Sequence, residues 1–183
     1  MASWLRKLAA LALALGGCED APPTLGGEEA SRLAEADREE LAYLASRLGI
    51  EASRIALTAP PDGSGHWVEI VGDRVARMQI QGASELHDLA WVGRFPELVQ
   101  LRLVDVPLRS LRELAAPALR ELRVAKTPLE GLAELAGAPG LETLMLLDVP
   151  LRSFRTLPAL PGLRTLAAEG VVLDDLAGLD LPT

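Results

Sequence analysis

Between residues 73 and 182, apolar residues return with a period of about 22 residues. Each period contains an apolar–polar–apolar alternation, followed further along by apolar residues three positions apart. Five consecutive segments align in this way, at 73–95, 96–116, 117–138, 139–160 and 161–182. The aligned apolar positions after the first segment are Leu98, Leu101, Leu103 and Leu108; Leu119, Leu122, Val124 and Leu129; Leu141, Leu144, Leu146 and Leu151; and Leu163, Leu166, Ala168 and Leu173.

The two spacings predict one strand and one helical turn in each segment. Alternation predicts a short strand with one buried face, because successive side chains of a strand point to opposite faces. The spacing of three predicts a turn of α-helix or 3-10 helix on the return path. A single segment cannot bury its own leucines, so we expect the segments to stack into a solenoid of the α/β class.

The segments resemble the leucine-rich repeat, L-x-x-L-x-L-x-x-N-x-L, in a short subclass, over roughly 110 of the 183 residues. The resemblance implies parallel strands on a concave face and short helical or 3-10 turns on a convex face. The chain departs from the family at the asparagine position, because it contains no asparagine at all. We therefore predict a looser or more helical turn than the family has, or a poorly ordered last segment. The residues at that position are Ala83, Val106, Thr127, Val149 and Val171.

The residues before the repeats predict a helix and a hairpin. Residues 28–48 have a helical pattern, in which Asp37 and Glu40 have capping-box spacing and Gly49 suits the position after the helix. Residues 58–66 predict a loop. Two strands at 67–71 and 74–80 flank Gly-Asp, the order of a type II′ turn. We expect the helix, the hairpin, Trp67 and Trp91 to cover the open N-terminal end of the solenoid.

The N-terminus predicts export. Arg6 and Lys7 precede an eight-residue apolar run that is too short to cross a bilayer, which needs about 20 residues. The sequence LGGC, ending at Cys18, resembles the lipobox of bacterial lipoproteins. That resemblance implies cleavage before Cys18 and attachment of lipid to its sulfur, although an ordinary cleaved signal or a buried N-terminal helix remain alternatives. The expected organisation is a lipoprotein signal peptide at 1–17, a flexible tether at 18–27, an N-terminal helix and capping region at 28–72, and the repeats at 73–183.

In the leucine-rich repeat family, the strand residues between the leucines face the concave surface. We expect Arg102 and Arg123 to lie one strand apart with Gln79 beside them, and Met145 and Leu147 to form an apolar spot on the next strand. This mixture is typical of a protein-binding surface, although a merely solvated sheet face is the alternative. The predicted partner-binding residues are Arg77, Gln79, Gln100, Arg102, Glu121, Arg123, Thr143, Met145 and Leu147.

Composition excludes several other classes of function. A net charge of −8 argues against nucleic acid, which needs a basic surface. His66 and His87 are the sole histidines and Cys18 the sole cysteine, so neither a metal site nor a cofactor is expected. The sequence GSG before His66 lacks the strand–turn–helix context of a nucleophile elbow, and no catalytic residues are predicted.

We therefore expect an exported, lipid-anchored leucine-rich repeat protein of a bacterial envelope that binds a protein partner and is not an enzyme. The alternative is a structural or sensing envelope lipoprotein without a ligand on the concave face. Little sequence follows Leu179 to cover the last repeat, so we also consider self-association through that edge. The competing interpretation is that Asp174, Asp175, Asp180 and Pro182 make this edge sufficiently polar.

Overall fold

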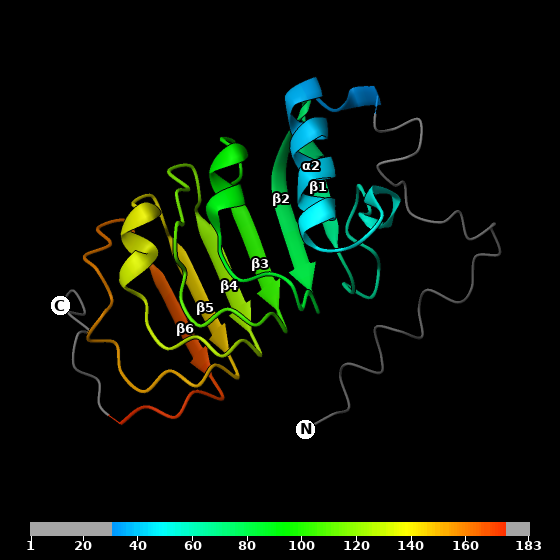
Figure 1. The fold of residues 1–183 in the computed structure, drawn as a ribbon. Coiled ribbons are helices and arrows are strands. Elements are labelled where there is room, and N and C mark those ends of the chain that lie inside the picture. Colours follow the sequence, from blue (N-terminus) through cyan, green and yellow to red (C-terminus); the bar gives the residue numbers. More distant parts are fainter. Residues whose placement is uncertain (1–30, 175–183) are drawn as a thin grey trace, which may run out of the picture.

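The structure is a computed structural model that describes residues 31–174, and in these residues the chain forms one six-stranded sheet and one α-helix (Figure 1). The strands are adjacent in the sheet in chain order. They are β1 (Trp67–Val71), β2 (Arg74–Gln81), β3 (Gln100–Val104), β4 (Glu121–Ala125), β5 (Thr143–Leu147) and β6 (Thr165–Glu169). The helices are α2 (Glu35–Arg47) and the 3-10 helices η2 (Ala52–Arg54), η3 (Ala90–Arg94) and η4 (Ala133–Gly137).

Strands β2 to β6 are parallel and pair in a constant register. Leu101 of β3 pairs with Met78 on one side and with Leu122 on the other, and the series continues through Leu144 to Leu166. Each step therefore joins equivalent positions of successive sequence segments. The predicted row of parallel strands with a period of about 22 residues is confirmed.

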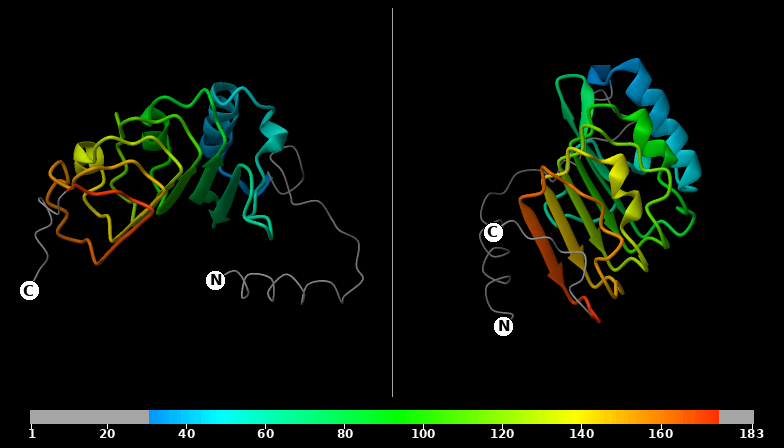
Figure 2. Two further views of the ribbon diagram at one scale, coloured as in Figure 1. Left: turned by 90° about the horizontal axis from the view of Figure 1, so that it is seen from below. Right: turned by 90° about the vertical axis from the view of Figure 1, so that its left-hand side faces the viewer.

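The sheet and the return segments form two layers (Figure 2). The strands lie on one side, and α2, η3, η4 and the coil segments lie on the other. The aligned leucines fill the space between the layers, and from Leu98 to Leu151 they are almost fully buried. Burial of each such leucine contributes about 2 kcal/mol before the cost of ordering the chain.

The last strand is packed less completely than the others. Leu163 and Leu166 are only partly buried, Ala168 is exposed, and Val172 is 79% exposed. Within residues 31–174, β6 is the edge of the sheet and has no strand on its outer side. Residues 175–183 lie outside the described part of the chain, so self-association through this edge stays a prediction.

The predicted helical turns on the return path are confirmed in two of the repeats. Segments 73–95 and 117–138 contain η3 and η4. In the second and fourth segments the return path is made of turns and extended chain, yet Leu111 and Phe154 are still buried there. The spacing of three therefore identifies the buried positions correctly but does not by itself require a helix.

The turn at the position of the missing asparagine is not helical, and whether it is looser than in the family stays a prediction. One residue after each of β2 to β6 has a left-handed backbone, with φ between 51° and 66°. The N–H of each of the first four donates to a carbonyl of the next repeat at 2.8–2.9 Å, which continues the ladder of the sheet. The residues in this position are Gly82, Asp105, Lys126, Asp148 and Gly170.

The asparagine position itself is used for packing. Ala83, Val106 and Val149 are buried there. Thr127 is buried as well, and its hydroxyl donates to the carbonyl oxygen of Ala125 at 3.0 Å. The turn is therefore held by backbone pairing between repeats, with one threonine hydroxyl in addition.

Helix α2 begins later than predicted. It starts at Glu35 without a side-chain cap, so residues 31–34 are not α-helical as predicted, and Asp37 lies inside the helix and does not cap it; residues 28–30 lie outside the described part of the chain. Glu40 instead binds Arg94 of η3 at 2.8 Å. The end of the helix is as expected: Gly49 has φ +65°, and its N–H and that of Ile50 donate to carbonyls of the last turn.

Asp37 joins the helix to the sheet. Its side chain is 1% exposed, accepts a hydrogen bond from the N–H of Val75 at 2.7 Å and forms an ion pair with Arg74 at 2.7 Å. Val75 and Arg74 are the first residues of β2. A carboxylate in the first turn of α2 thus fixes the start of the first parallel strand.

The hairpin before the repeats is confirmed. Strands β1 and β2 are antiparallel, and Gly72 between them has φ +69°. Asp73 does not have a positive φ, which fits a type II′ turn and excludes type I′.

Asp37→Ala is predicted to lower the free energy of unfolding by about 3 kcal/mol, because it leaves the Val75 N–H and the Arg74 guanidinium without their acceptor. Urea denaturation measures this change. Glu35→Ala in the same turn is the control; its ion pair with Arg38 is exposed and contributes at most about 1 kcal/mol. Equal losses in the two variants would contradict the role given to Asp37.

Candidate functional site

The non-leucine residues of the strands form three rows across one side of the sheet, which we call the open face. Because strand side chains alternate, this face is opposite to the leucine core. The parallel register aligns each row. The first row is Arg77, Gln100, Glu121, Thr143 and Thr165; the second is Gln79, Arg102, Arg123, Met145 and Ala167; the third is Gln81, Val104, Ala125, Leu147 and Glu169.

All nine residues predicted to bind a partner lie on the open face. Arg102 and Arg123 are register neighbours, with Gln79 on the other side of Arg102, as expected. Met145 and Leu147 follow on β5, next to Arg123 and Ala125. The structure thus brings the predicted residues together, and their role in binding stays a prediction.

Charges in the first row are paired. Arg77 forms an ion pair with Glu69 of β1 at 2.7 Å. The side-chain amide of Gln100 donates to Glu121 at 2.7 Å. These polar groups already bind one another, so the first row presents little unpaired charge.

The second row differs, because its two arginines have no acidic partner. Within residues 31–174, neither Arg102 nor Arg123 has a carboxylate within ion-pair distance. The guanidinium of Arg102 lies 5.6 Å from the ring centre of Trp67, and its Nε is buried without a hydrogen-bond acceptor. Adjacent strands are about 4.8 Å apart, so two positive side chains project side by side from this row.

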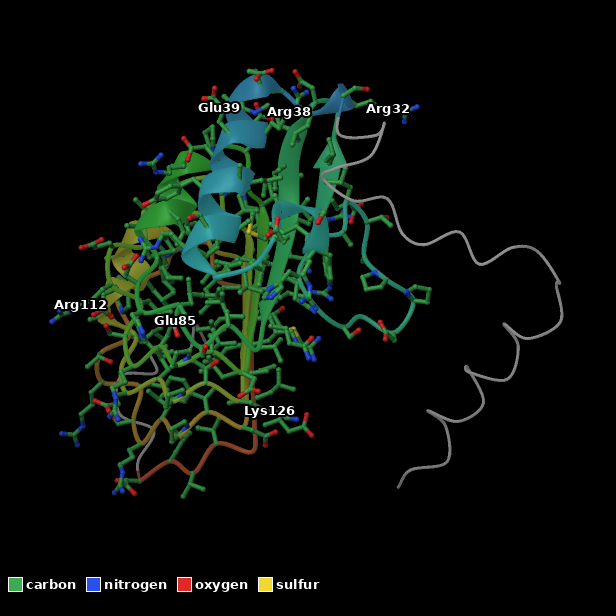
Figure 3. The ribbon with its side chains drawn as sticks, turned by 45° about the vertical axis from the view of Figure 1, so that its right-hand side comes forward. Arg32, Arg38, Glu39, Glu85, Arg112 and Lys126 are labelled. Atoms are coloured by element: carbon green, nitrogen blue, oxygen red, sulfur yellow. The ribbon has the colours of Figure 1, made fainter. Side chains whose placement is uncertain are left out.

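A groove with a volume of about 460 Å³ follows the second and third rows. Its floor contains both arginines and the apolar side chains of the third row. One wall is the loop at 58–66, and Lys126 and Asp148 line the end where the strands finish. Figure 3 shows Lys126 at this end of the sheet, on the opposite side from Arg112 and Glu85. The lining residues are Asp62, Gly63, Ser64, Gln79, Gln81, Arg102, Val104, Arg123, Ala125, Lys126, Leu147 and Asp148.

The loop at 58–66 is fixed to the open face by two glutamines. The amide nitrogen of Gln79 donates to the carbonyl oxygens of Gly63 at 2.6 Å and Gly65 at 3.2 Å. The amide oxygen of Gln81 accepts from the N–H of Gly65 at 3.0 Å. Gln79 is only 4% exposed, so it positions the wall of the groove and is not itself available to a ligand.

The tip of the loop is ordered by Asp62. Its carboxylate accepts hydrogen bonds from the N–H of Ser64 at 3.0 Å and from the hydroxyl of Ser64 at 2.8 Å. Both bonds favour the ionised form and hold the pKa of Asp62 below its usual value. Asp62 is therefore an anion at one border of the groove.

The expectation that Trp67 and Trp91 cover the N-terminal end stays a prediction, and the structure adds that Trp67 also contributes to the open face. Trp67 is in β1, pairs with Gln79 and is 3% exposed, with its ring toward Arg102 on the open face. Trp91 is buried in η3, where its N–H donates to the carbonyl oxygen of Asp88 and its ring meets Phe95 edge to face. The hairpin adds β1 to the N-terminal edge of the sheet, so Trp67 lies both at that end and on the open face.

His66 lies where the loop joins β1. Burial, and to a smaller degree the positive charge of Arg54, lower the pKa of His66. Its Nδ1 accepts a long hydrogen bond, 3.4 Å, from the N–H of Gln81. This arrangement requires the neutral imidazole, because a protonated Nδ1 has no free lone pair. His66 is therefore a structural part of the loop attachment.

The described residues contain neither a metal-binding cluster nor a membrane-spanning helix. No cluster of three or more histidine, cysteine, aspartate or glutamate residues between 31 and 174 is arranged to hold a metal ion. No helix in the same range has the length and the apolar character needed to cross a membrane. Cys18, the signal peptide at 1–17 and the tether at 18–27 lie outside the described residues.

Similarity to known proteins is limited to solved structures. No protein-family profile and no curated protein matches the sequence. Among solved structures, the leucine-rich-repeat ectodomain of the receptor kinase SOBIR1 from Arabidopsis thaliana matches at 17% identity and a TM-score of 0.44, over 77% of this chain and 97% of that chain. The description of this fold as leucine-rich-repeat-like rests on the strand register and the period of about 22 residues.

Lowering the pH from about 7.5 to about 5.5 is predicted to lower the melting temperature through His66. The pKa of His66 is lowered in the folded state, so the unfolded chain binds more protons and stability is lost as the pH falls below about 6.5. Thermal unfolding followed by circular dichroism tests this: His66→Gln should reduce the dependence on pH. The exposed His87→Gln is the control, and an equal reduction there would contradict the assignment.

Proposed function

We propose that the protein binds a protein partner through the open face, which forms the concave surface of a leucine-rich repeat solenoid. The observation that carries the proposal is the pair of unpaired arginines, Arg102 and Arg123, in a groove beside apolar side chains. Positive side chains without an acidic partner, beside half-buried apolar side chains, give this face groups that a ligand can bind. Arginine and methionine are also enriched in protein interfaces.

The rigidity of the groove supports binding by a preformed surface. Its floor is a sheet with a buried core behind it, and its wall is held by Gln79 and Gln81. A ligand that enters a preformed site loses less free energy to ordering of the protein. The groove does contain a hydroxyl–carboxylate pair, Ser64 with Asp62, but both residues are exposed at the tip of the loop and their bonds order that turn, so we assign the pair no catalytic role.

We further propose that the protein is a lipoprotein exported to a bacterial envelope. The sequence LGGC and the short apolar run before it support attachment of lipid to Cys18. Two acyl chains anchor a protein firmly without a spanning helix. The tether at 18–27 would then present the open face to a partner close to the membrane surface. A structural or sensing envelope lipoprotein with no ligand on this face is the second candidate, and it is supported by the same N-terminal sequence.

The open face is tested by cross-linking and capture from the membranes of the cells that produce the protein. Arg102→Glu combined with Arg123→Glu should abolish capture of the partner, because the change reverses both unpaired charges. Arg32→Glu combined with Arg112→Glu makes the same change of net charge at exposed positions away from the groove and should retain capture (Figure 3). Capture that is identical for both double variants, or absent throughout, would favour the structural or sensing alternative.

The anchor is tested by the intact mass of the protein extracted from membranes. We expect a chain that begins at residue 18 and carries the mass of attached acyl chains. Cys18→Ala should remove that mass and release the protein from the membrane fraction. An unmodified chain in the membrane fraction, or a Cys18→Ala variant that stays there, would contradict the lipoprotein assignment.

A further inference from the structure

We infer that the groove recognises an extended segment of the partner in which one acidic side chain lies two residues from a large apolar side chain. This inference deepens the proposed function and rests on it. The acidic group would bind between Arg102 and Arg123, and the apolar group would lie on Leu147 in the groove and on Met145, which is on the same face of β5 outside the groove lining. Four observations on the open face lead to this chemistry.

The first observation is that Arg102 and Arg123 are half-buried neighbours without a carboxylate partner in residues 31–174, whereas the other described arginines without an ion pair, Arg32, Arg54, Arg112 and Arg164, are exposed to solvent. Arg47, Arg94 and Arg109 each have a carboxylate oxygen within 2.8 Å. Arg102 and Arg123 have none among residues 31–174, although their strands are adjacent in the sheet. Two neighbouring cations repel one another, and a carboxylate placed between them removes that repulsion.

The second observation is that Arg102 is held in place before a ligand arrives. Its guanidinium lies over the ring of Trp67 at 5.6 Å, and Trp67 is buried under the loop wall. A guanidinium is planar and suits a planar carboxylate, and its attraction to the aromatic ring limits the orientations that the Arg102 side chain adopts. The Arg102 side chain therefore loses little conformational entropy when its guanidinium N–H groups bind an acidic side chain.

The third observation is the distance to the apolar side chains. A point midway between Arg102 and Arg123 is one and a half strand spacings from β5, or about 7 Å. Side chains two residues apart in an extended chain lie on the same side and are also separated by about 7 Å. An acidic residue and an apolar residue with one residue between them therefore match the two halves of the face, while adjacent residues would point to opposite sides.

The fourth observation limits the ligand to a single acidic group. Asp62 and Asp148 border the groove at the loop and at the ends of the strands. The pKa of Asp62 is held low by its bonds to Ser64, so it stays ionised. Lys126 lines the same end of the groove as Asp148, so the three cations of the lining exceed its two carboxylates by one; with a net charge of −8 on the whole protein, this disfavours a polyanion and leaves the arginine pair as the place for one negative charge.

Fluorescence anisotropy of short labelled peptides with the full-length protein tests the inference. The probe is Gly-Ser-Glu-Ser-Leu-Ser-Gly with a blocked C-terminus, so its one carboxylate is the glutamate side chain. We expect it to bind at least about tenfold more tightly than the peptide with Gln in place of Glu. A peptide with Glu and Leu adjacent should show a similar loss, because its two side chains point to opposite sides.

Variants of the protein assign the effect to residues. Arg102→Gln and Arg123→Gln should each weaken binding of the glutamate peptide about tenfold and should leave the glutamine peptide unchanged. Met145→Ser should weaken both peptides equally, because it removes the apolar contact. Arg112→Gln, on the opposite side of the sheet, is the matched control and should bind as the unchanged protein does (Figure 3).

Three results would overturn the inference: equal affinity for the glutamate and glutamine peptides, no effect of spacing, or displacement of the peptide by an equal concentration of inorganic phosphate. Failure here is distinguishable from failure of the proposed function. If capture of the partner depends on Arg102 and Arg123 but the glutamate peptide does not compete with it, the open face is the binding surface and the assigned chemistry is wrong. If no partner is captured, the proposed function itself is wrong.

Discussion

The fold depends on the backbone hydrogen bonds between neighbouring parallel strands. From β2 to β6, each strand pairs with the next in the same register, so that equivalent positions of successive repeats are adjacent. This register places the aligned leucines on one side of the sheet and the rows of the open face on the other. A slip by one residue would exchange the two sides and bury Arg102 and Arg123 in place of Leu101 and Leu122. Core and candidate site are therefore consequences of the same hydrogen bonds.

The turns after the strands maintain this register without the asparagine that is typical of leucine-rich repeats. A left-handed residue ends each strand, and its N–H continues the backbone ladder into the next repeat. This conformation costs about 1–2 kcal/mol for a residue other than glycine, and Asp105, Lys126 and Asp148 all adopt it. The ladder replaces a buried side-chain amide with backbone bonds, which frees positions such as Val106 and Val149 for packing.

Much of the fold and part of the site follow from the sequence alone. The period and the alternation place the strands, the core and the three rows, because side-chain direction in a strand depends only on position. The wall of the groove is different. It needs Gln79 to reach the carbonyl of Gly63, a contact between a strand and an irregular loop that has no periodic pattern. The position of Trp67 on the open face also depends on tertiary contacts, as does the link from Asp37 to β2. Local sequence patterns do not encode such contacts.

The most direct test of this account is the register itself. Cys18→Ala first removes the native cysteine. A short bifunctional thiol reagent should then cross-link the double variant Arg102→Cys/Arg123→Cys, because the two positions are register neighbours on the open face. It should also cross-link Arg123→Cys/Met145→Cys, for the same reason. Cysteines at Arg102 and Val124 should not be joined, because Val124 points into the core. A cross-link between positions 102 and 124, without one between positions 102 and 123, would show that β3 and β4 pair in another register. The core and the groove described above would then both be wrong.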